Sequence, residues 1–183
     1  MQETSDRRKT IVNGTLTITG LTRLSEETFW DTEKGVLRIG GQRHTAIDAQ
    51  TLCDHLDTLV GSKVAEVIMH NLEFRLGKLD ATRFRNEKPQ ATLQELVEYL
   101  AKTARLSGLG ITNVTLLENE KSDPVQIEIA NPSVKGSAGA AKAFGFSWWA
   151  GVMTTLLDKQ MEPHDIFYDR EKDVIRCRLV ARV

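Results

Sequence analysis

The sequence predicts a single α+β domain in which an antiparallel sheet of hairpins packs against about four helices. Two observations predict this class. Segments rich in β-branched and aliphatic residues come in pairs with short connections, as in residues 111–117 with 125–130 and 166–168 with 174–183. Between these pairs, apolar residues recur three or four positions apart, which is the spacing of amphipathic helices. Neighbouring strands that follow one another favour antiparallel pairing, with the helices on one side.

Composition sets the class of protein. The chain has 183 residues, of which 40% are hydrophobic and 27% are charged, as expected for one globular domain. No apolar run approaches the roughly 20 residues that span a bilayer. The 24 Lys and Arg residues against 25 Asp and Glu residues leave a formal charge of −1, so no basic field attracts nucleic acid. Residues 1–10 lack the apolar stretch of a secretion signal. We expect a cytoplasmic protein that neither binds nucleic acid nor inserts into a membrane.

The first half of the chain predicts strands followed by two helices. Residues 11–18 and 36–39 are typical of strands, and residues 45–60 form a helix that Gly61 ends. A second helix begins near Ser62 and carries one apolar stripe, formed by Val64, Ile68, Leu72, Leu76 and Leu79. Residues 80–90 are polar and end in an Asn-Glu-Lys-Pro sequence, so they predict a loop or lid.

The second half alternates helices and hairpins. Thr92 and Glu95 form a capping-box pattern, and the following helix has a clean buried face of Leu93, Leu96, Val97, Leu100, Ala101 and Ala104. That helix ends at residues 107–110. A long helix is predicted over residues 138–159 after Ser137, which suits a cap. Residues 166–168 and 174–183 form the closing strands around a turn.

The order of several segments resembles a known family. The segments LRIGGQRHTAIDAQTLCDHLDTLVG, ELVEYLAKTARLSGLGITNVTLLE, VQIEIANPSVKG and FSWWAGVMTTLL follow one another as in the 4-vinyl reductase domain, which is related to subunits of the transport protein particle and to haem-based nitric-oxide sensors. The resemblance covers residues 36–183 and implies their common ligand-binding fold, with residues 1–35 as an N-terminal extension that carries a strand. Members sense aromatic hydrocarbons in transcription regulators, accompany chlorophyll-pigment biosynthesis or act as scaffolds.

The chain departs from the family's cysteine pattern. The last family helix usually opens with Cys-x-Phe-x-x-Gly; aligning Gly151 with its glycine places Phe146 at the cysteine and Trp148 at the phenylalanine. The closing hairpin keeps only Cys177. A soft-metal site needs several thiolate or imidazole ligands around one ion, so we expect no metal site. We expect both cysteines, Cys53 and Cys177, to be reduced packing residues.

The last long helix carries the candidate ligand-binding residues. They are its aromatic and glycine-rich N-terminal part, namely Phe144, Phe146, Trp148, Trp149, Gly151 and Met153. Adjacent helical residues point about 100° apart, so at most one of the two indoles is expected to point at the core while the other faces a pocket edge, a partner or solvent. The alternative is that both are core or dimer-interface packing.

Other polar residues give weaker signals. Glu66, Glu73, Arg75 and Lys78 alternate in sign, which is typical of a solvated helix face, although His70 and Glu73 lie three apart and form a carboxylate–imidazole pair. The four histidines lack the spacing of metal ligands. Arg176, Arg178 and Arg182 share one face of the last strand, either as a polar outer face or as an anion-binding row.

Three functional hypotheses remain. The first is a binding or sensor module for a small hydrophobic molecule, working as a homodimer, with residues 80–90 as its gate. The second is a tetrapyrrole vinyl reductase or its accessory subunit, which the family name suggests. The sequence has neither a dinucleotide signature nor a thiolate cluster, so it names no cofactor and no catalytic residue. The third is a homo-oligomeric scaffold in which the Trp148 and Trp149 surface pairs subunits.

Overall fold

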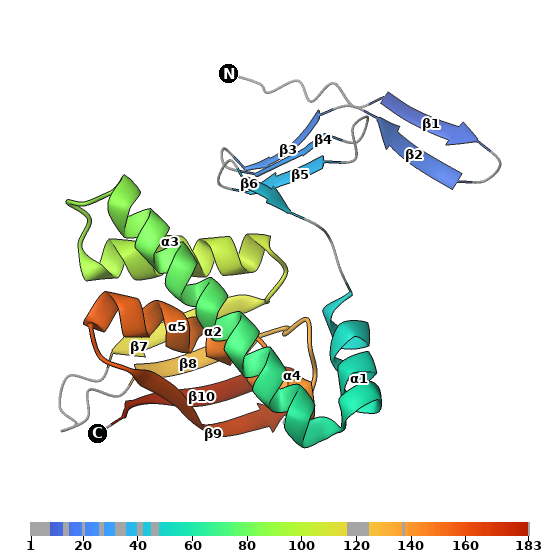
Figure 1. Cartoon of the computed structure of the whole chain (residues 1–183). Helices are drawn as coiled ribbons and strands as arrows, with labels where there is room; N and C mark the ends of the chain where they lie inside the picture. The colour runs from blue at the N-terminus through green and yellow to red at the C-terminus, as the bar shows by residue number, and fades with distance from the viewer. Residues whose placement is uncertain are drawn as a thin grey trace. The chain divides into compact units, whose positions relative to one another are not determined.

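The chain divides into two compact units, Met1–Ile47 and Asp48–Val183. The computed structural model describes residues 8–12, 15–19, 21–25, 28–31, 36–39, 42–44, 48–116, 125–136 and 138–182, and describes side chains only from Asp48 onward (Figure 1). The predicted division of the chain after residue 35 stays a prediction.

The first unit consists of β-structure in its described residues. A hairpin pairs β1 (Arg8–Val12) with β2 (Thr15–Thr19). A separate antiparallel sheet has the order β3-β4-β5-β6, formed by Leu21–Ser25, Thr28–Asp31, Val36–Ile39 and Gln42–His44. The strand predicted over residues 36–39 is confirmed, whereas residues 11–18, predicted as one strand, belong to two strands that pair with each other.

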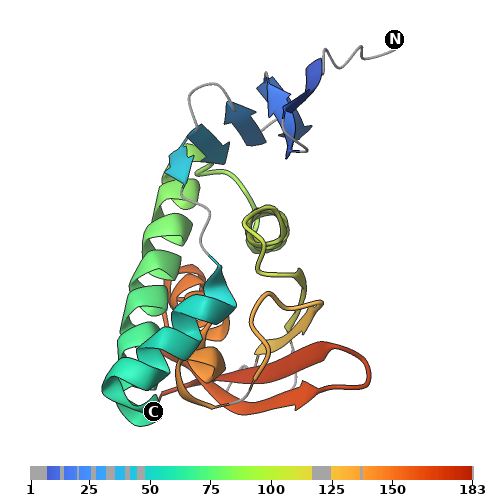
Figure 2. The same ribbon diagram turned by 90° about the vertical axis from the view of Figure 1, so that its right-hand side faces the viewer.

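The second unit confirms the predicted fold class. Its antiparallel sheet has the order β7-β8-β10-β9, formed by Ile111–Leu116, Val125–Ala130, Val174–Ala181 and Met161–Asp169. Both predicted hairpins are present, and β9 begins five residues earlier than expected. The helices lie on one face of this sheet, as Figure 2 shows. Among the described residues, no helix has both the length and the apolar character that a membrane crossing requires.

The first three helices follow one another at the start of the unit. Helix α1 (Ala49–Val60) begins where the Asp48 carboxylate accepts a hydrogen bond from the Thr51 amide. Helix α2 (Ser62–Glu87) is followed by a turn and by α3 (Leu93–Leu106), whose predicted capping box between Thr92 and Glu95 is confirmed. Because α2 continues to Glu87, the predicted loop or lid is wrong for residues 80–87, whereas residues 88–90 lie in the turn before α3. Within the helical part, Phe84 packs into the core.

The long helix predicted over residues 138–159 is two helices. Helix α4 (Gly139–Ala143) and helix α5 (Phe146–Leu157) are separated by Phe144 in an extended conformation and by Gly145 with φ of +77°. A positive φ suits glycine, which has no Cβ to clash, and it redirects the chain between the two helices. Helix α5 ends at Asp158, which adopts a left-handed conformation. The prediction of one continuous helix is therefore wrong.

The apolar stripe predicted for α2 does not face the core. Its residues, Val64, Ile68, Leu72, Leu76 and Leu79, are between 43% and 65% exposed. The buried face instead consists of smaller or less apolar residues spaced three or four apart, namely Ala65, Met69, Glu73, Gly77, Ala81 and Phe84. Small side chains let α2 approach α5 closely, and larger aliphatic side chains on that face would hold the two helices apart.

Candidate functional site

Helix α5 is covered on both sides by the rest of its unit. It packs against α2 on one side, and its residues join the sheet and α3 in one hydrophobic core on the other. All its residues from Phe146 to Met153 are buried. This placement explains why a helix with apolar residues on nearly every side is stable here.

Two glycines make the crossing of α2 and α5 close. A Cβ atom at Gly77 would lie 1.9 Å from the carbonyl oxygen of Trp148, and one at Gly151 would lie 2.1 Å from the carbonyl oxygen of Phe74. The two backbones therefore touch at this point, and neither position accepts a side chain without moving a helix. Gly151, a predicted ligand-binding residue, faces the backbone of α2.

Both tryptophans lie in the interior, which corrects the expectation that only one does. Trp148 is 6% exposed and Trp149 is fully buried, with their rings edge to face at 5.0 Å between centroids. The two side chains point about 100° apart around the helix axis, which would expose one indole if the helix were packed on a single side. Because α5 is packed on two sides, both directions lead into the protein. The predicted pairing of subunits through these indoles is therefore wrong.

The two indole N–H groups have different environments. Trp148 Nε1 donates a hydrogen bond of 2.9 Å to Asp80 Oδ2 of α2. Trp149 Nε1 is buried and has no acceptor among the described residues. A buried donor without a partner costs about 1–3 kcal/mol, so such groups are rare in folded proteins. The Trp149 N–H is thus a buried polar group that is available to a ligand.

The remaining predicted residues divide between two clusters. Phe146 and Met153 are fully buried in the same core as the two tryptophans. Phe144 is half-buried and packs against a separate cluster that includes Cys53 and Met69. The structure therefore brings together Phe146, Trp148, Trp149 and Met153, and places Phe144 apart from them.

A buried carboxylate at the break between α4 and α5 was missed by the sequence analysis. Glu73 lies on the inner face of α2 and accepts a hydrogen bond of 3.2 Å from the Gly145 amide. Burial raises its pKa to about 7, the Gly145 hydrogen bond opposes that rise, and the Asp80 charge adds to it. The prediction of a solvated face is wrong for Glu73. The signal was its spacing of four residues from Met69 and from Gly77.

A second polar contact joins the same two helices. His70 Nδ1 lies 2.9 Å from the hydroxyl of the fully buried Ser147, and the imidazole stacks on Phe74 at 5.7 Å between ring centroids. With the contacts of Glu73 and Asp80, it makes a row of polar links along the interface of α2 and α5. These links fix the rotation of α5, and hence the direction in which Trp149 points.

The start of α4 has a partner that the sequence did not indicate. Asp57 of α1 accepts a hydrogen bond of 2.9 Å from the Ala140 amide, and a Cβ atom at Gly139 would lie 2.1 Å from its carboxylate. The predicted cap, Ser137, lies outside the described residues.

Both cysteines are free and lie in the interior. Cys53 and Cys177 are buried, and burial raises the pKa of their thiols to about 11 and about 12, respectively. Among residues whose side chains are described, no group of three or more His, Cys, Asp or Glu residues could hold a metal ion.

The arginine row on β10 is neutralised by acids. Arg176 pairs with Glu128 at 2.7 Å, Arg182 pairs with Glu162 at 3.1 Å, and Arg178 pairs with Asp165. This supports the interpretation of the row as a polar outer face rather than an anion-binding site.

Comparison with known proteins supports the fold. No protein-family model and no curated sequence matches the chain. Among solved structures, it is similar to the phenol-responsive sensory domain of the transcription activator PoxR, crystallised with phenol, at a TM-score of 0.66 and 12% identity over 85% of each chain. The chain therefore has the fold of a ligand-binding sensory domain.

Proposed function

We propose that the chain is a sensor module of the 4-vinyl-reductase-domain type that binds a small hydrophobic molecule with one polar group. The observation that carries this proposal is the buried Trp149 N–H without an acceptor among the described residues. An oxygen atom of a bound ligand would satisfy this donor and recover the free energy that its burial costs. The ligand would contact Trp149, Phe146 and Met153. Contacts of Phe144, Trp148 and Gly151 with it stay predictions.

The interior around Trp149 has features that suit such a ligand. Thr112 on β7 is a second buried polar side chain whose hydroxyl has no partner among the described residues, and its strand partner Ile129 belongs to the same core as Trp149. Met153 and Met161 are fully buried there, and unbranched methionines repack readily around an added group. The similarity in fold to a phenol-responsive domain also supports the proposal.

Phenol is the probe that tests this proposal. We expect phenol to raise the Tm of the full chain, and toluene, which has the same ring without an acceptor, to raise it less. Trp149→Phe should abolish the difference between phenol and toluene, because it removes the N–H and keeps an aromatic ring. Trp148→Phe is the matched control, since its N–H is already bonded to Asp80, and it should keep the difference. Equal shifts for phenol and toluene in the wild type would contradict the proposal.

A second proposal concerns self-association through the outer face of α2 and the end of α1. This apolar face consists of eight exposed aliphatic residues, namely Leu59, Val60, Val64, Val67, Ile68, Leu72, Leu76 and Leu79. Each of them is at least 42% exposed, and an apolar face of several residues suits a standard interface, to which each partner contributes roughly 800 Å². A ridge of residues four apart also packs against a copy of itself around a two-fold axis. We therefore propose a homodimer formed through the apolar face.

The dimer is tested by sedimentation of the full chain. Leu72→Glu should halve the mass, because it places a charge at the centre of the apolar face. The control is Gln94→Glu, which adds the same charge at an exposed position on α3 and should leave the mass unchanged. A wild-type chain that sediments as a monomer would refute the dimer.

No specific observation favours the tetrapyrrole-reductase alternative, and we do not propose it.

A further inference from the structure

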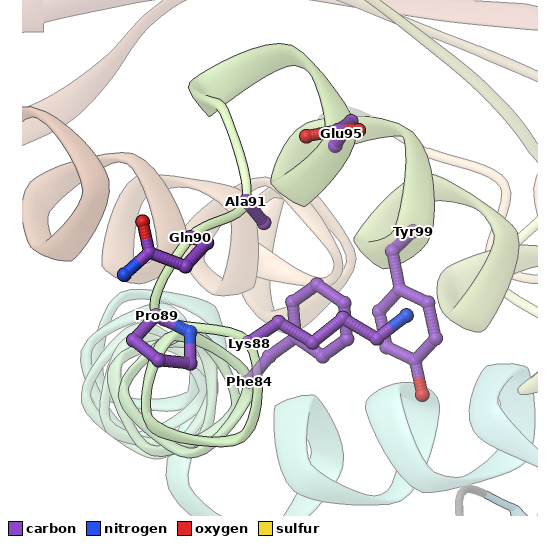
Figure 3. Close-up of a pocket in the computed structure, with 7 residues that line it drawn as sticks. All are labelled: Phe84, Lys88, Pro89, Gln90, Ala91, Glu95 and Tyr99. Carbon is purple, nitrogen blue, oxygen red and sulfur yellow. The ribbon is translucent and has the colours of Figure 1, made fainter.

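A surface pocket lies at the junction of α2 and α3, apart from the region of Trp149. It has a volume of about 480 Å³ and is lined by Phe84, Lys88, Pro89, Gln90, Ala91, Glu95 and Tyr99 (Figure 3). This volume is in the range of pockets that hold small organic ligands. The seven residues come from the last turn of α2, the short turn that follows and the first two turns of α3. We call this site the α2–α3 pocket.

One wall of the α2–α3 pocket is aromatic and held in place by the core. The rings of Phe84 and Tyr99 are stacked, with centroids 3.7 Å apart and an angle of 2° between their planes. Phe84 is 3% exposed and belongs to the main core, against which the half-buried Tyr99 also packs. A wall with both rings fixed loses little conformational entropy when a flat ligand packs on it.

A single ammonium group extends across this wall. The Lys88 side chain runs over the aromatic pair, with Nζ 5.2 Å from the Phe84 centroid and 5.4 Å from the Tyr99 centroid (Figure 3). Within the described part of the chain, Lys88 Nζ makes these ring contacts and no ion pair with a carboxylate within 4.0 Å. Its hydrogen-bond donors therefore remain available to a ligand in the pocket.

The carboxylate in the lining is already engaged. Glu95 Oε2 accepts hydrogen bonds from the Thr92 amide at 2.7 Å and from the Thr92 hydroxyl at 2.9 Å, and the first of these belongs to the capping box of α3. These bonds hold the pKa of Glu95 below its usual value, so it stays ionised. The pocket thus offers a positive group with free donors and a negative group with one oxygen already engaged, which favours a ligand that brings acceptors to Lys88.

We propose that the α2–α3 pocket binds a small aromatic carboxylic acid, whose ring packs along Phe84, Pro89 and Tyr99 while its carboxylate pairs with Lys88. The ring supplies the apolar area and the carboxylate completes the hydrogen bonding of the ammonium. The volume accommodates acids with one or two rings. This site is separate from the one proposed around Trp149, so the two proposals stand or fail independently.

The test is a titration of the full-length chain, followed by the backbone amide resonances of Lys88, Gln90 and Ala91. Benzoate should shift these resonances, acetate should not, and benzamide, the neutral analogue of the same shape, should bind at least fivefold more weakly. A two-ring acid such as 2-naphthoate should bind more tightly than benzoate, because it buries more apolar area.

Variants separate the contribution of the Lys88 charge to binding from that of the aromatic wall. Lys88→Gln should weaken benzoate about fivefold and leave benzamide unchanged. Lys63→Gln, at the exposed opposite end of α2, is the matched control and should change neither ligand. Tyr99→Leu should weaken both ligands, because it removes the aromatic wall. Equal binding of benzoate and benzamide, or an unchanged affinity for benzoate in Lys88→Gln, overturns the proposal, and so does the absence of any shift with benzoate or 2-naphthoate. Loss of the phenol response in Trp149→Phe has no bearing on this result.

Discussion

The buried face of α2 is less apolar than its exposed face, which is the reverse of what the composition of the two faces indicates. The inner face carries Gly77, two alanines and the ionisable Glu73, whereas the outer face carries most of the large aliphatic residues of the helix. The inner face is buried because it is small enough to let α5 approach to backbone contact. The outer face is apolar without any described partner. Burial within the chain here depends on the shape of the helix face as well as on its hydrophobicity.

The largest expected effect comes from filling the inner face. Gly77→Ala places a Cβ atom 1.9 Å from the Trp148 carbonyl oxygen, a backbone atom that can move only with the whole of α5. We expect a loss of at least about 3 kcal/mol in the free energy of unfolding, measured by urea denaturation, since overpacking at a backbone contact cannot be relieved by a rotamer change. A loss below about 1 kcal/mol would show that the helices do not cross this closely.

The next effect is a dependence of stability on pH through Glu73. Its folded-state pKa of about 7 is raised above its ordinary value of 4.5, so between these values the folded protein holds a proton that the unfolded chain has released. Stability from this group is therefore fully present below about pH 4.5 and is lost as the pH rises through 7, by roughly 3 kcal/mol in total. The Gly145 amide, which precedes α5, and Asp80 of α2 are the neighbouring polar groups that modulate this titration.

Glu73→Gln isolates this contribution. The amide still accepts the Gly145 hydrogen bond but does not titrate, so the variant should be more stable than the wild type at pH 8 and show a flatter profile between pH 4.5 and 7. Glu98→Gln, at an exposed position on α3, is the control and should keep the wild-type profile. Chemical denaturation at intervals of pH measures both. An unchanged slope in Glu73→Gln would contradict the burial of an ionisable carboxyl group.

A smaller effect distinguishes the indole that contacts α2 from the one that does not. Trp148→Phe removes a hydrogen bond and leaves Asp80 without its indole donor, whereas Trp149→Phe removes a donor that has no described acceptor. Both variants lose similar volume. We expect Trp148→Phe to be the more destabilising by about 1–2 kcal/mol in ligand-free protein, measured by thermal denaturation. Equal losses would indicate that Trp149 has found an acceptor.

The smallest effect is expected on the outer face. Leu76→Ser at low protein concentration, where a dimer is dissociated, should change the free energy of unfolding by less than about 0.5 kcal/mol, because the side chain is 43% exposed. At high concentration the same variant should lower the Tm relative to the wild type. A large loss at low concentration would mean that this face is packed within one chain.

The sequence predicted those elements whose signals are local. The capping box at Thr92 and Glu95 and the two hairpins of the second sheet were recognised because neighbouring residues determine caps and strand pairs. The break at Gly145 was missed because Phe144 and Phe146 continue a helical apolar pattern, and the Gly145 amide at this break bonds to Glu73, which is 72 residues away.

For the region around Trp149, the sequence indicated the aromatic segment and the tertiary structure decided how its residues are buried. The α+β class was predicted from paired strand segments and helical periodicity. That both indoles are buried, that one of them lacks an acceptor among the described residues, and that Lys88 extends over two stacked rings depend on where α2, α3 and α5 meet. Periodicity within one segment specifies which residues share a face, but the shape of the neighbouring element decides which face is buried.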